Sequence, residues 1–314
     1  MTSSNPPGKR IAIVVPADSL KTAKPVLNCV SRLADRDIVE FVLVLPDSEK
    51  MAETELPGAL DVRIARVPSI YPLSRSRAEG IRAATAECVF IGETHSFPRE
   101  GLFKSLLDAH DRGATVVVPM FENENPIGLV SWAGMLNGYA AWAWPRPEGP
   151  IGYAPLFNAS YLRSFLLGAA ANLESALLTG EDMMGRVKRS EGFAAFAPDA
   201  RIGHVNIARL EDWLPQRLVA GRVIASVRSS RWSRTRRVAF SIAAPLIPLV
   251  LLARHGQSIR KSIDHSGTSA LVLPLIGLGL MFQAAGEFLG YAFGPSERAN
   301  RAYDEYEVEQ MSFG

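Results

Sequence analysis

The sequence predicts an α/β protein with a mostly parallel sheet, helices on both faces of that sheet, and a C-terminal helical hairpin associated with a membrane. Short apolar runs typical of buried strands alternate with amphipathic segments over residues 10–228, and this pattern favours parallel strands joined by helices. Two uncharged apolar stretches follow at 238–253 and 270–286. We therefore expect a disordered N-terminus over 1–9, a soluble domain over 10–228, and a basic, membrane-associated region with a short tail over 229–314.

Each element of the soluble domain is predicted from its own pattern. Runs rich in Val, Ile and Phe indicate buried strands, and the alternating run at 62–68 indicates a half-buried one. Apolar residues near helical spacing indicate the first helix, and Gly113 ends the last. The predicted strands are residues 10–16, 40–46, 62–68, 87–92 and 114–121, and the predicted helices are residues 20–36, 75–86 and 102–113.

Composition excludes several classes of protein. Apolar residues make up 47% of the chain, and its 25 glycines raise this share to about 55%, which exceeds the ~45–50% usual for soluble domains. So high an apolar share excludes a disordered or fibrous chain. The net charge of +2 argues against a nucleic-acid partner. Cys29 and Cys88 lie too far apart for a disulfide framework or zinc ribbon and favour a reducing compartment. No phosphate-loop or dinucleotide-binding motif occurs, and the N-terminal apolar run is too short for an export signal.

The flanks of the first apolar stretch are typical of a membrane protein. As a helix, 238–253 measures about 24 Å against a ~30 Å hydrocarbon core, whereas 270–294 is long enough to cross it. The two stretches are compatible with two full membrane spans, with a shallow re-entrant hairpin, and with a buried hairpin of a soluble domain. We expect residues 10–228 and the C-terminus on the cytosolic side. A collar that faces anionic lipid is predicted from Trp232 and five arginines, Arg228, Arg231, Arg234, Arg236 and Arg237.

Candidate chemistry lies where the predicted strands end, because ligands bind beyond the carboxyl ends of parallel strands. Asp18 and Asp47 follow the first two strands, and Glu93-Thr94-His95 follows the fourth. A carboxylate and an imidazole two residues apart can share a divalent cation. An ordinary polar turn is the alternative for this stretch. Glu181 and Asp182 form a second acidic site, which either supplies a general base or only stabilises a helix N-terminus.

The order of these pieces resembles the inverting, family-two glycosyltransferases with the GT-A fold. The resemblance covers about residues 10–230 and rests on loose motifs in the family's order. Two departures leave a catalytically inactive relative open: Ala78 replaces the family's Asn, and Glu93-Thr94-His95 replaces its Asp-x-Asp turn. The stretches that carry the resemblance are IAIVVPAD, VLVLPDS, SRSRAEGIRAATAECVFIGETHSFP, GEDMMGRVKRSEGFAAFAPDARIGHV and WLPQRLVAGRVIASVR.

This resemblance implies roles for particular residues. Asp182 would be the catalytic base, and Glu181 would orient it or bind the acceptor. Glu93, His95 and His204 would hold Mn²⁺ or Mg²⁺. The residues implied in donor binding are Asp18, Asp47, Arg77, Gln216, Arg217 and Arg222. For Arg77, a solvated helix position is the alternative, and for residues 216–222 a helix at the membrane surface.

Aromatic residues gather between 131 and 157 and predict a wall that binds the acceptor, since sugar C–H faces pack on aromatic rings. Ordinary core packing is the alternative. The residues concerned are Trp132, Tyr139, Trp142, Trp144 and Tyr153.

Together these observations predict a membrane-anchored transferase of polysaccharide or cell-envelope synthesis. It would move a hexose from a nucleotide-sugar to a lipid-linked or polysaccharide acceptor with inversion, in contact with membrane lipid. A catalytically degenerate scaffold of a polysaccharide assembly complex is the second hypothesis. A nucleotidyltransferase is a third, weakened by the absence of a Gly-rich, Lys-containing segment after the first strand.

Overall fold

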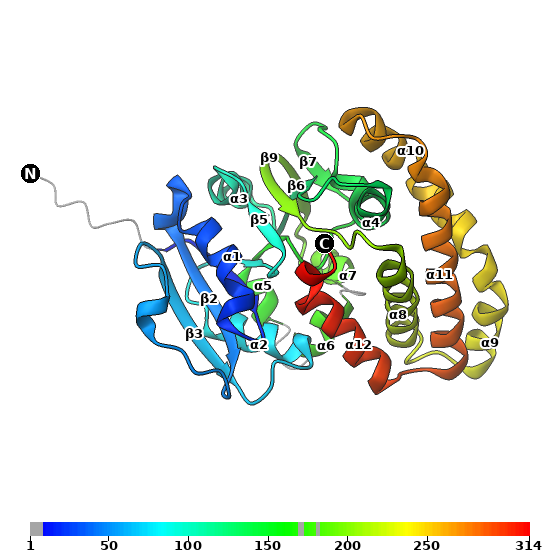
Figure 1. Ribbon diagram of the computed structural model, residues 1–314, viewed down its shortest axis with the longest axis horizontal. Coiled ribbons are helices and arrows are strands. Elements are labelled where there is room, and N and C mark those ends of the chain that lie inside the picture. Colours follow the sequence, from blue (N-terminus) through cyan, green and yellow to red (C-terminus); the bar gives the residue numbers. More distant parts are fainter. Residues whose placement is uncertain (1–8, 169–172, 180–182) are drawn as a thin grey trace, which may run out of the picture. The chain divides into compact units, whose positions relative to one another are not determined.

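The computed structural model describes residues 9–168, 173–179 and 183–314 (Figure 1). Its contacts divide the chain into two compact units, Met1–Met120 with Arg146–Gly203, and Phe121–Pro145 with His204–Gly314. Most of the predicted disordered N-terminus lies outside the described residues, and Lys9 donates a hydrogen bond to the carbonyl of Asp37. Residues 204–228, which the sequence assigns to the soluble domain, group with the C-terminal helices.

The first unit is built on a mixed sheet in the order β3-β2-β1-β4-β8-β6-β9-β5, with β7 paired to β9. β1, β2, β3 and β4 run parallel to one another, whereas β8 is antiparallel to both β4 and β6. The sheet therefore confirms the predicted α/β class, with a parallel half and an antiparallel insertion. The strands are β1 (Ile11–Pro16), β2 (Val39–Pro46), β3 (Asp61–Val67), β4 (Cys88–Ile91), β5 (Ser96–Pro98), β6 (Val116–Asn123), β7 (Gly149–Ile151), β8 (Ser160–Leu162) and β9 (Ala194–His204).

The parallel half forms as predicted because its strands are apolar enough to be covered on both faces. Every residue of β1 is buried, and so are the first seven of β2. The register pairs Ile11 with Val39 and with Cys88, so the three strands end at one edge of the sheet. Helix α2 packs closely at this point, because a Cβ at Gly80 would overlap the side chain of Val14.

Helices cover this sheet, and one of them is shorter than predicted. Ser19 caps α1 by accepting a hydrogen bond from the amide of Thr22. The predicted helix over 20–36 ends at Val30, and a separate 3₁₀ helix follows at Ala34–Ile38. The amide of Ala34, at the start of this 3₁₀ helix, donates a hydrogen bond to the carboxylate of Glu100. The helices of the first unit are α1 (Leu20–Val30), α2 (Leu73–Ala83), α3 (Leu102–Asp111), α5 (Arg163–Leu167), α6 (Leu173–Thr179) and α7 (Met183–Arg189), with 3₁₀ helices at Ala34–Ile38 and Glu53–Glu55.

The second unit is mainly helical and has its own core. Trp213 of α8 lies in this core with residues of α4 and α11, including Ala133 and Ile276. The Oγ of Ser262 on α10 donates to the carbonyl of Ala140 at the end of α4. The helices are α4 (Leu129–Tyr139), α8 (Leu210–Arg228), α9 (Arg234–Ala243), α10 (Ile247–Ser266), α11 (Val272–Phe293) and α12 (Glu297–Val308), with 3₁₀ helices at Ala140–Trp142, Ala244–Leu246 and Gln310–Ser312.

Helices α8 and α11 lie side by side and touch through their backbones (Figure 1). A Cβ at Gly221 of α8 would overlap the carbonyl of Gln283, and a Cβ at Gly286 of α11 would overlap the carbonyl of Leu218. Gly290 faces the carbonyl of Arg222 in the same way. Only glycine permits so close an approach of two helices.

The first apolar stretch lies in a longer helical segment than predicted, whereas the second forms a slightly shorter helix, Val272–Phe293 in place of 270–294. Two helical segments, Arg234–Ser266 and Val272–Phe293, are long and apolar enough to cross a membrane, which is weak evidence for a membrane protein. The predicted connecting segment 254–269 is largely helical, because α10 continues to Ser266 before Gly267 ends it with a φ of +67°. The break in the first segment lies instead at Ala244–Leu246, next to Pro245 and Pro248.

Candidate metal and donor site

Glu93 and His95 lie in a turn at the carboxyl end of β4. The amide of Gly92 donates to the carbonyl of Val14, which carries the pairing of β4 with β1 into this turn. The turn leads directly into β5, and both side chains are buried, Glu93 with 4% of its surface exposed and His95 with 1%. A carboxylate removed from water in this way requires polar partners.

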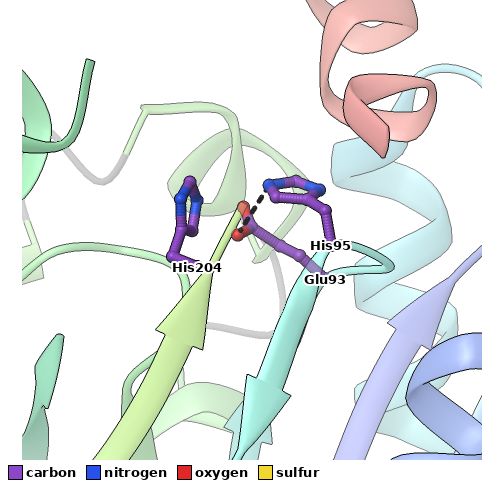
Figure 2. A group of neighbouring side chains, drawn as sticks. All are labelled: Glu93, His95 and His204. Atoms are coloured by element: carbon purple, nitrogen blue, oxygen red, sulfur yellow. Dashed lines mark ion pairs between the residues drawn. The ribbon is translucent and has the colours of Figure 1, made fainter. Parts of the chain in front are cut away.

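His204 completes a cluster with these two side chains. It is the last residue of β9, which pairs with β5 in the sheet. Among the described residues, Glu93, His95 and His204 form a group in which one ligand atom from each lies within 4.8 Å of the others (Figure 2). The Nε2 of His95 is 3.3 Å from a carboxylate oxygen of Glu93. The sequence therefore identified three residues that the fold brings together.

Side chains from other elements orient the Glu93 carboxylate. The Nδ2 of Asn158 donates to its Oε2 at 2.5 Å, and the hydroxyl of Ser96 donates to the same oxygen at 3.2 Å. Asn158 is held just before β8, where its amide donates to the carbonyl of Ile91 at the end of β4. Its backbone has a φ of +53°, a conformation that asparagine tolerates better than most residues.

Arg77 supplies a buried positive charge beside this carboxylate. It lies on α2 with 3% of its surface exposed, and its guanidinium is 4.0 Å from Oε1 of Glu93. The same guanidinium lies 3.6 Å from the centre of the Phe157 ring, a cation–π contact. Arg77 is therefore not a solvated helix arginine. Among the described residues its Nε has no hydrogen-bond partner.

The ring of His204 is oriented by a polar and an aromatic neighbour. Its Nδ1 is 3.1 Å from Oδ1 of Asn206, and its Nε2 is 3.3 Å from the hydroxyl of Tyr139. Tyr139 stacks in turn on Phe121, with ring centres 4.2 Å apart. A proton on Nδ1 would be donated to Asn206, which leaves the lone pair of Nε2 to accept a hydrogen bond or bind a cation.

The donor set of this cluster fits a transition metal better than magnesium. One carboxylate oxygen and two imidazole nitrogens suit Mn²⁺, Fe²⁺ or Zn²⁺, whereas Mg²⁺ prefers oxygen ligands. Burial of all three side chains agrees with a preformed site. The cluster could therefore hold a metal ion.

Asp18 and Asp47 lie beyond the ends of β1 and β2, which the parallel pairing places at the same edge of the sheet as the end of β4. Asp18 is half-buried and accepts a hydrogen bond from the hydroxyl of Ser19. Asp47 is exposed, and its amide donates to the carbonyl of Val67. Their contribution to donor binding stays a prediction.

The basic residues of α8 face other helices. Arg217 donates to the Oε1 of Gln283 on α11, and burial lowers the pKa of Arg217. The Nε of Arg217 and that of Arg222 are buried and have no hydrogen-bond partner among the described residues. Gln216 is half-buried on the same helix. Donor binding by these three residues stays a prediction.

The predicted aromatic wall is divided between the two units. In the second, Trp132 packs against the hydrophobic core, Trp142 is buried with its ring 6.3 Å from that of Phe121, and Trp144 lies 4.4 Å from the ammonium group of Lys261. In the first, Tyr153 is 62% exposed. Acceptor binding stays a prediction for all four, and Trp132 and Trp142 also have the packing role that was the alternative.

Glu181 and Asp182 lie outside the described residues, so their predicted catalytic role is not tested. Helix α7 begins at Met183, directly after them. Arg186 on this helix donates to the carbonyl of Phe165 at 2.9 Å and lies over its ring. The segment that follows the two acids is therefore anchored to the first unit.

Three residues of the site escaped the sequence analysis: Ser96, Asn158 and Asn206. Ser96 follows the Glu-x-His turn immediately, so its nearness to Glu93 was a signal that could have been used. Asn158 is 65 residues away from Glu93 in the sequence. Only the pairing of β8 with β4 brings it to the site, and no local pattern indicates this.

No protein-family model matches the chain, and no curated protein matches it. Among solved structures, S. aureus TarS 1–349 in complex with UDP-GlcNAc is similar at a TM-score of 0.47 and 14% identity, over 96% of this chain and 92% of TarS 1–349. A second structure of S. aureus TarS 1–349 gives a TM-score of 0.46 and 15% identity, over 96% and 91% of the two chains. A likeness of this degree assigns neither an activity nor a substrate.

Proposed function

We propose that this protein is a metal-dependent glycosyltransferase that moves a sugar from a nucleotide-sugar donor to an acceptor hydroxyl with inversion. The observation that carries the proposal is the buried Glu93–His95–His204 cluster at the sheet edge where parallel α/β folds bind ligands. The family-two resemblance implies that these three residues hold a cation beside the donor diphosphate. The buried charge of Arg77 beside Glu93 supports the same reading.

The reaction requires three tasks from the chain. The acceptor oxygen forms a bond to the anomeric carbon while the bond from that carbon to the diphosphate breaks, and the acceptor proton passes to a base. We assign the base to Asp182 and its orientation to Glu181. Arg77 supplies fixed positive charge near the departing diphosphate. A metal held by Glu93, His95 and His204 would supply further positive charge for that leaving group.

The donor set favours Mn²⁺ over Mg²⁺ for this role, since two of the three ligands are imidazoles. The same ligand types also occur in zinc hydrolases and non-haem iron enzymes. Metal identity is therefore part of the proposal. It is tested by binding measurements with each ion.

The acceptor is proposed to be lipid-linked or a growing polysaccharide, and the enzyme to work at the cytosolic face of a membrane. The two long apolar helical segments give weak support for membrane association. Anchoring would confine enzyme and lipid-linked substrate to one surface. The exposed ring of Tyr153 and the half-buried rings of Trp132 and Trp144 are the proposed acceptor contacts.

The test is release of nucleoside diphosphate by the purified full chain from a panel of nucleotide-sugars with Mn²⁺, together with direct Mn²⁺ binding. Glu93→Gln should lose Mn²⁺ binding and activity. Glu40→Gln is the matched control, because Glu40 is an equally buried carboxylate at the opposite end of the sheet that is bonded to Arg63. Equal Mn²⁺ affinity of wild type and Glu93→Gln would contradict the metal site. Donor binding without turnover would favour the degenerate scaffold instead.

A further inference from the structure

Exposed apolar side chains gather on one part of the second unit. Of the seventeen large hydrophobic residues that are exposed among the described residues, twelve lie between Val238 and Phe293. Most of them lie on helices α9, α10 and α11, and α11 packs against both α9 and α10 (Figure 1). A soluble surface rarely exposes so many large apolar side chains within one short part of the chain without a partner. We call these twelve residues the apolar face: Val238, Phe240, Ile242, Leu246, Leu249, Val250, Leu252, Leu271, Leu273, Met281, Phe288 and Phe293.

The opposite side of α11 is polar and already occupied. Gln283 accepts a hydrogen bond from Arg217, and Glu287, which is 3% exposed, lies 3.2 Å from Arg228. The hydroxyl of Tyr291 also donates to Glu287. Helix α8 therefore packs along this side of α11, through the apolar contact of Trp213 near the start of α11 and through Arg217 and Arg228 further along.

The charge around the apolar face is predominantly positive, although Asp264 is exposed on α10 and Glu297 at the start of α12. Residues 213–263 contain ten lysines and arginines and no aspartate or glutamate. Arg231, Arg234 and Arg236 are exposed next to the start of α9, and Arg254, Arg260 and Lys261 are exposed on α10. An apolar surface bordered by exposed cations complements an anionic lipid surface.

We infer that α9, α10 and α11 dock face-on into one leaflet of an anionic bilayer and do not span it. The apolar face would enter the acyl boundary while the flanking arginines contact lipid phosphates. A spanning α11 would have to carry the arginines of α8 into the hydrocarbon, because the glycine contacts hold the two backbones together. The exposed cations of α10 oppose a second span for the same reason. This inference deepens the proposed membrane association and does not depend on glycosyl transfer.

Vesicle flotation of the full chain, without metal or nucleotide-sugar, tests the docking. We expect binding to equimolar phosphatidylcholine and phosphatidylglycerol, and much weaker binding to phosphatidylcholine alone or at high salt. Ile242→Asp and Leu249→Asp should each weaken binding roughly tenfold or more. Ile127→Asp is the matched control, because Ile127 is 82% exposed in the same unit but lies outside the apolar face. Equal binding of all three variants would overturn the proposal.

Two further measurements test, one at a time, whether the arginines contribute to binding and whether the helices cross the membrane. Arg234→Glu should weaken binding roughly tenfold, whereas Arg298→Glu, also at an exposed arginine, should not. A cysteine at Ser269, between α10 and α11, should react with an impermeant thiol reagent from the same side of the membrane as a cysteine at Ser69 in the first unit. Reaction of the Ser269 position from the opposite side only would show two spans and refute face-on docking, whatever the outcome of the activity assays.

Discussion

The two ends of the parallel half of the sheet each hold a buried carboxylate, and the two differ in what surrounds them. Glu40, at the start of β2, accepts hydrogen bonds from the amides of Thr85 and Ala86 and from Arg63 at 2.6 Å. Desolvation alone would raise the pKa of Glu40, but these donors outweigh it and hold the pKa below its usual range. Glu93, just beyond the end of β4, lies beside His95 and the guanidinium of Arg77 and accepts hydrogen bonds from the side chains of Asn158 and Ser96.

The histidines show the same contrast. His110 is buried between the carbonyl of Ala114 and the hydroxyl of Ser160, at 2.8 Å from each. Burial lowers the pKa of His110 to about 4, which keeps it neutral. His95 and His204 instead converge on a carboxylate. Burial of a titratable side chain therefore does not by itself indicate a functional residue. Ligand atoms of several side chains that lie close together indicate a candidate metal site.

The largest effect is expected from the acid that the structure does not describe. Asp182→Asn keeps the size of the side chain but removes its basicity, so sugar transfer should slow by roughly 10²–10⁴-fold. Nucleoside diphosphate release at saturating donor measures this. A wild-type rate in this variant would show that the catalytic base lies elsewhere and would weaken the assignment of chemistry to this edge.

A smaller effect is expected from the side chain that orients Glu93. Asn158→Ala removes the hydrogen bond to Oε2, and metal affinity should fall by roughly 10–100-fold. Titration with Mn²⁺, followed by the magnetic resonance signal of the free ion, measures the affinity. Asn28→Ala, at an exposed asparagine of α1, is the control and should bind Mn²⁺ as wild type does. Unchanged affinity in Asn158→Ala would show that its contact with Glu93 is only structural.

At the other end of the sheet, a substitution should lower the stability of the fold without changing the rate of sugar transfer. Glu40→Gln weakens charge-assisted bonds to the amides and to Arg63, and should lower the free energy of unfolding by about 1.5–3 kcal/mol. Urea unfolding measures this, and sugar transfer per folded molecule should not change. Loss of Mn²⁺ binding in this variant would remove the distinction between the two carboxylates.

The smallest effect concerns pH. Because the pKa of His110 is lower in the folded than in the unfolded chain, unfolding takes up a proton between about pH 4 and 6.5. The stability from His110 is complete above about pH 6.5 and declines as the pH falls, by roughly 1 kcal/mol between pH 7 and 5.5. Urea unfolding of wild type and His110→Gln at these pH values measures it. An equal decline in both chains would assign the pH dependence to other groups.

The sequence predicted the parallel half of the sheet because its strands are long and apolar. Strands β1 and β2 have six and eight residues, and nearly all of their side chains are buried. Strands β5, β7 and β8 have three residues each, too few for a periodic signal, and only tertiary pairing defines them. The same reason explains why Asn158 escaped prediction.

For the candidate site, residue type and position at a strand end were sufficient for Glu93 and His95, and the resemblance to the glycosyltransferase family added His204. The resemblance also indicated Arg77, but not its burial, which depends on the fold of α2 against the rest of the first unit. The helical course of 254–266 was also missed, because its charged residues suggested a loop, whereas Ile259 and Ser262 pack inward as on any amphipathic helix.

The glycine contacts between α8 and α11 limit where this chain can be truncated. A shortened chain that ends after Arg228 would keep α8 but leave Gly221 without the backbone it packs against, uncover Trp213 and leave Arg228 without Glu287. The C-terminal helices are therefore not a removable tether. They complete the fold of the unit that includes His204, so work on this protein requires the intact chain.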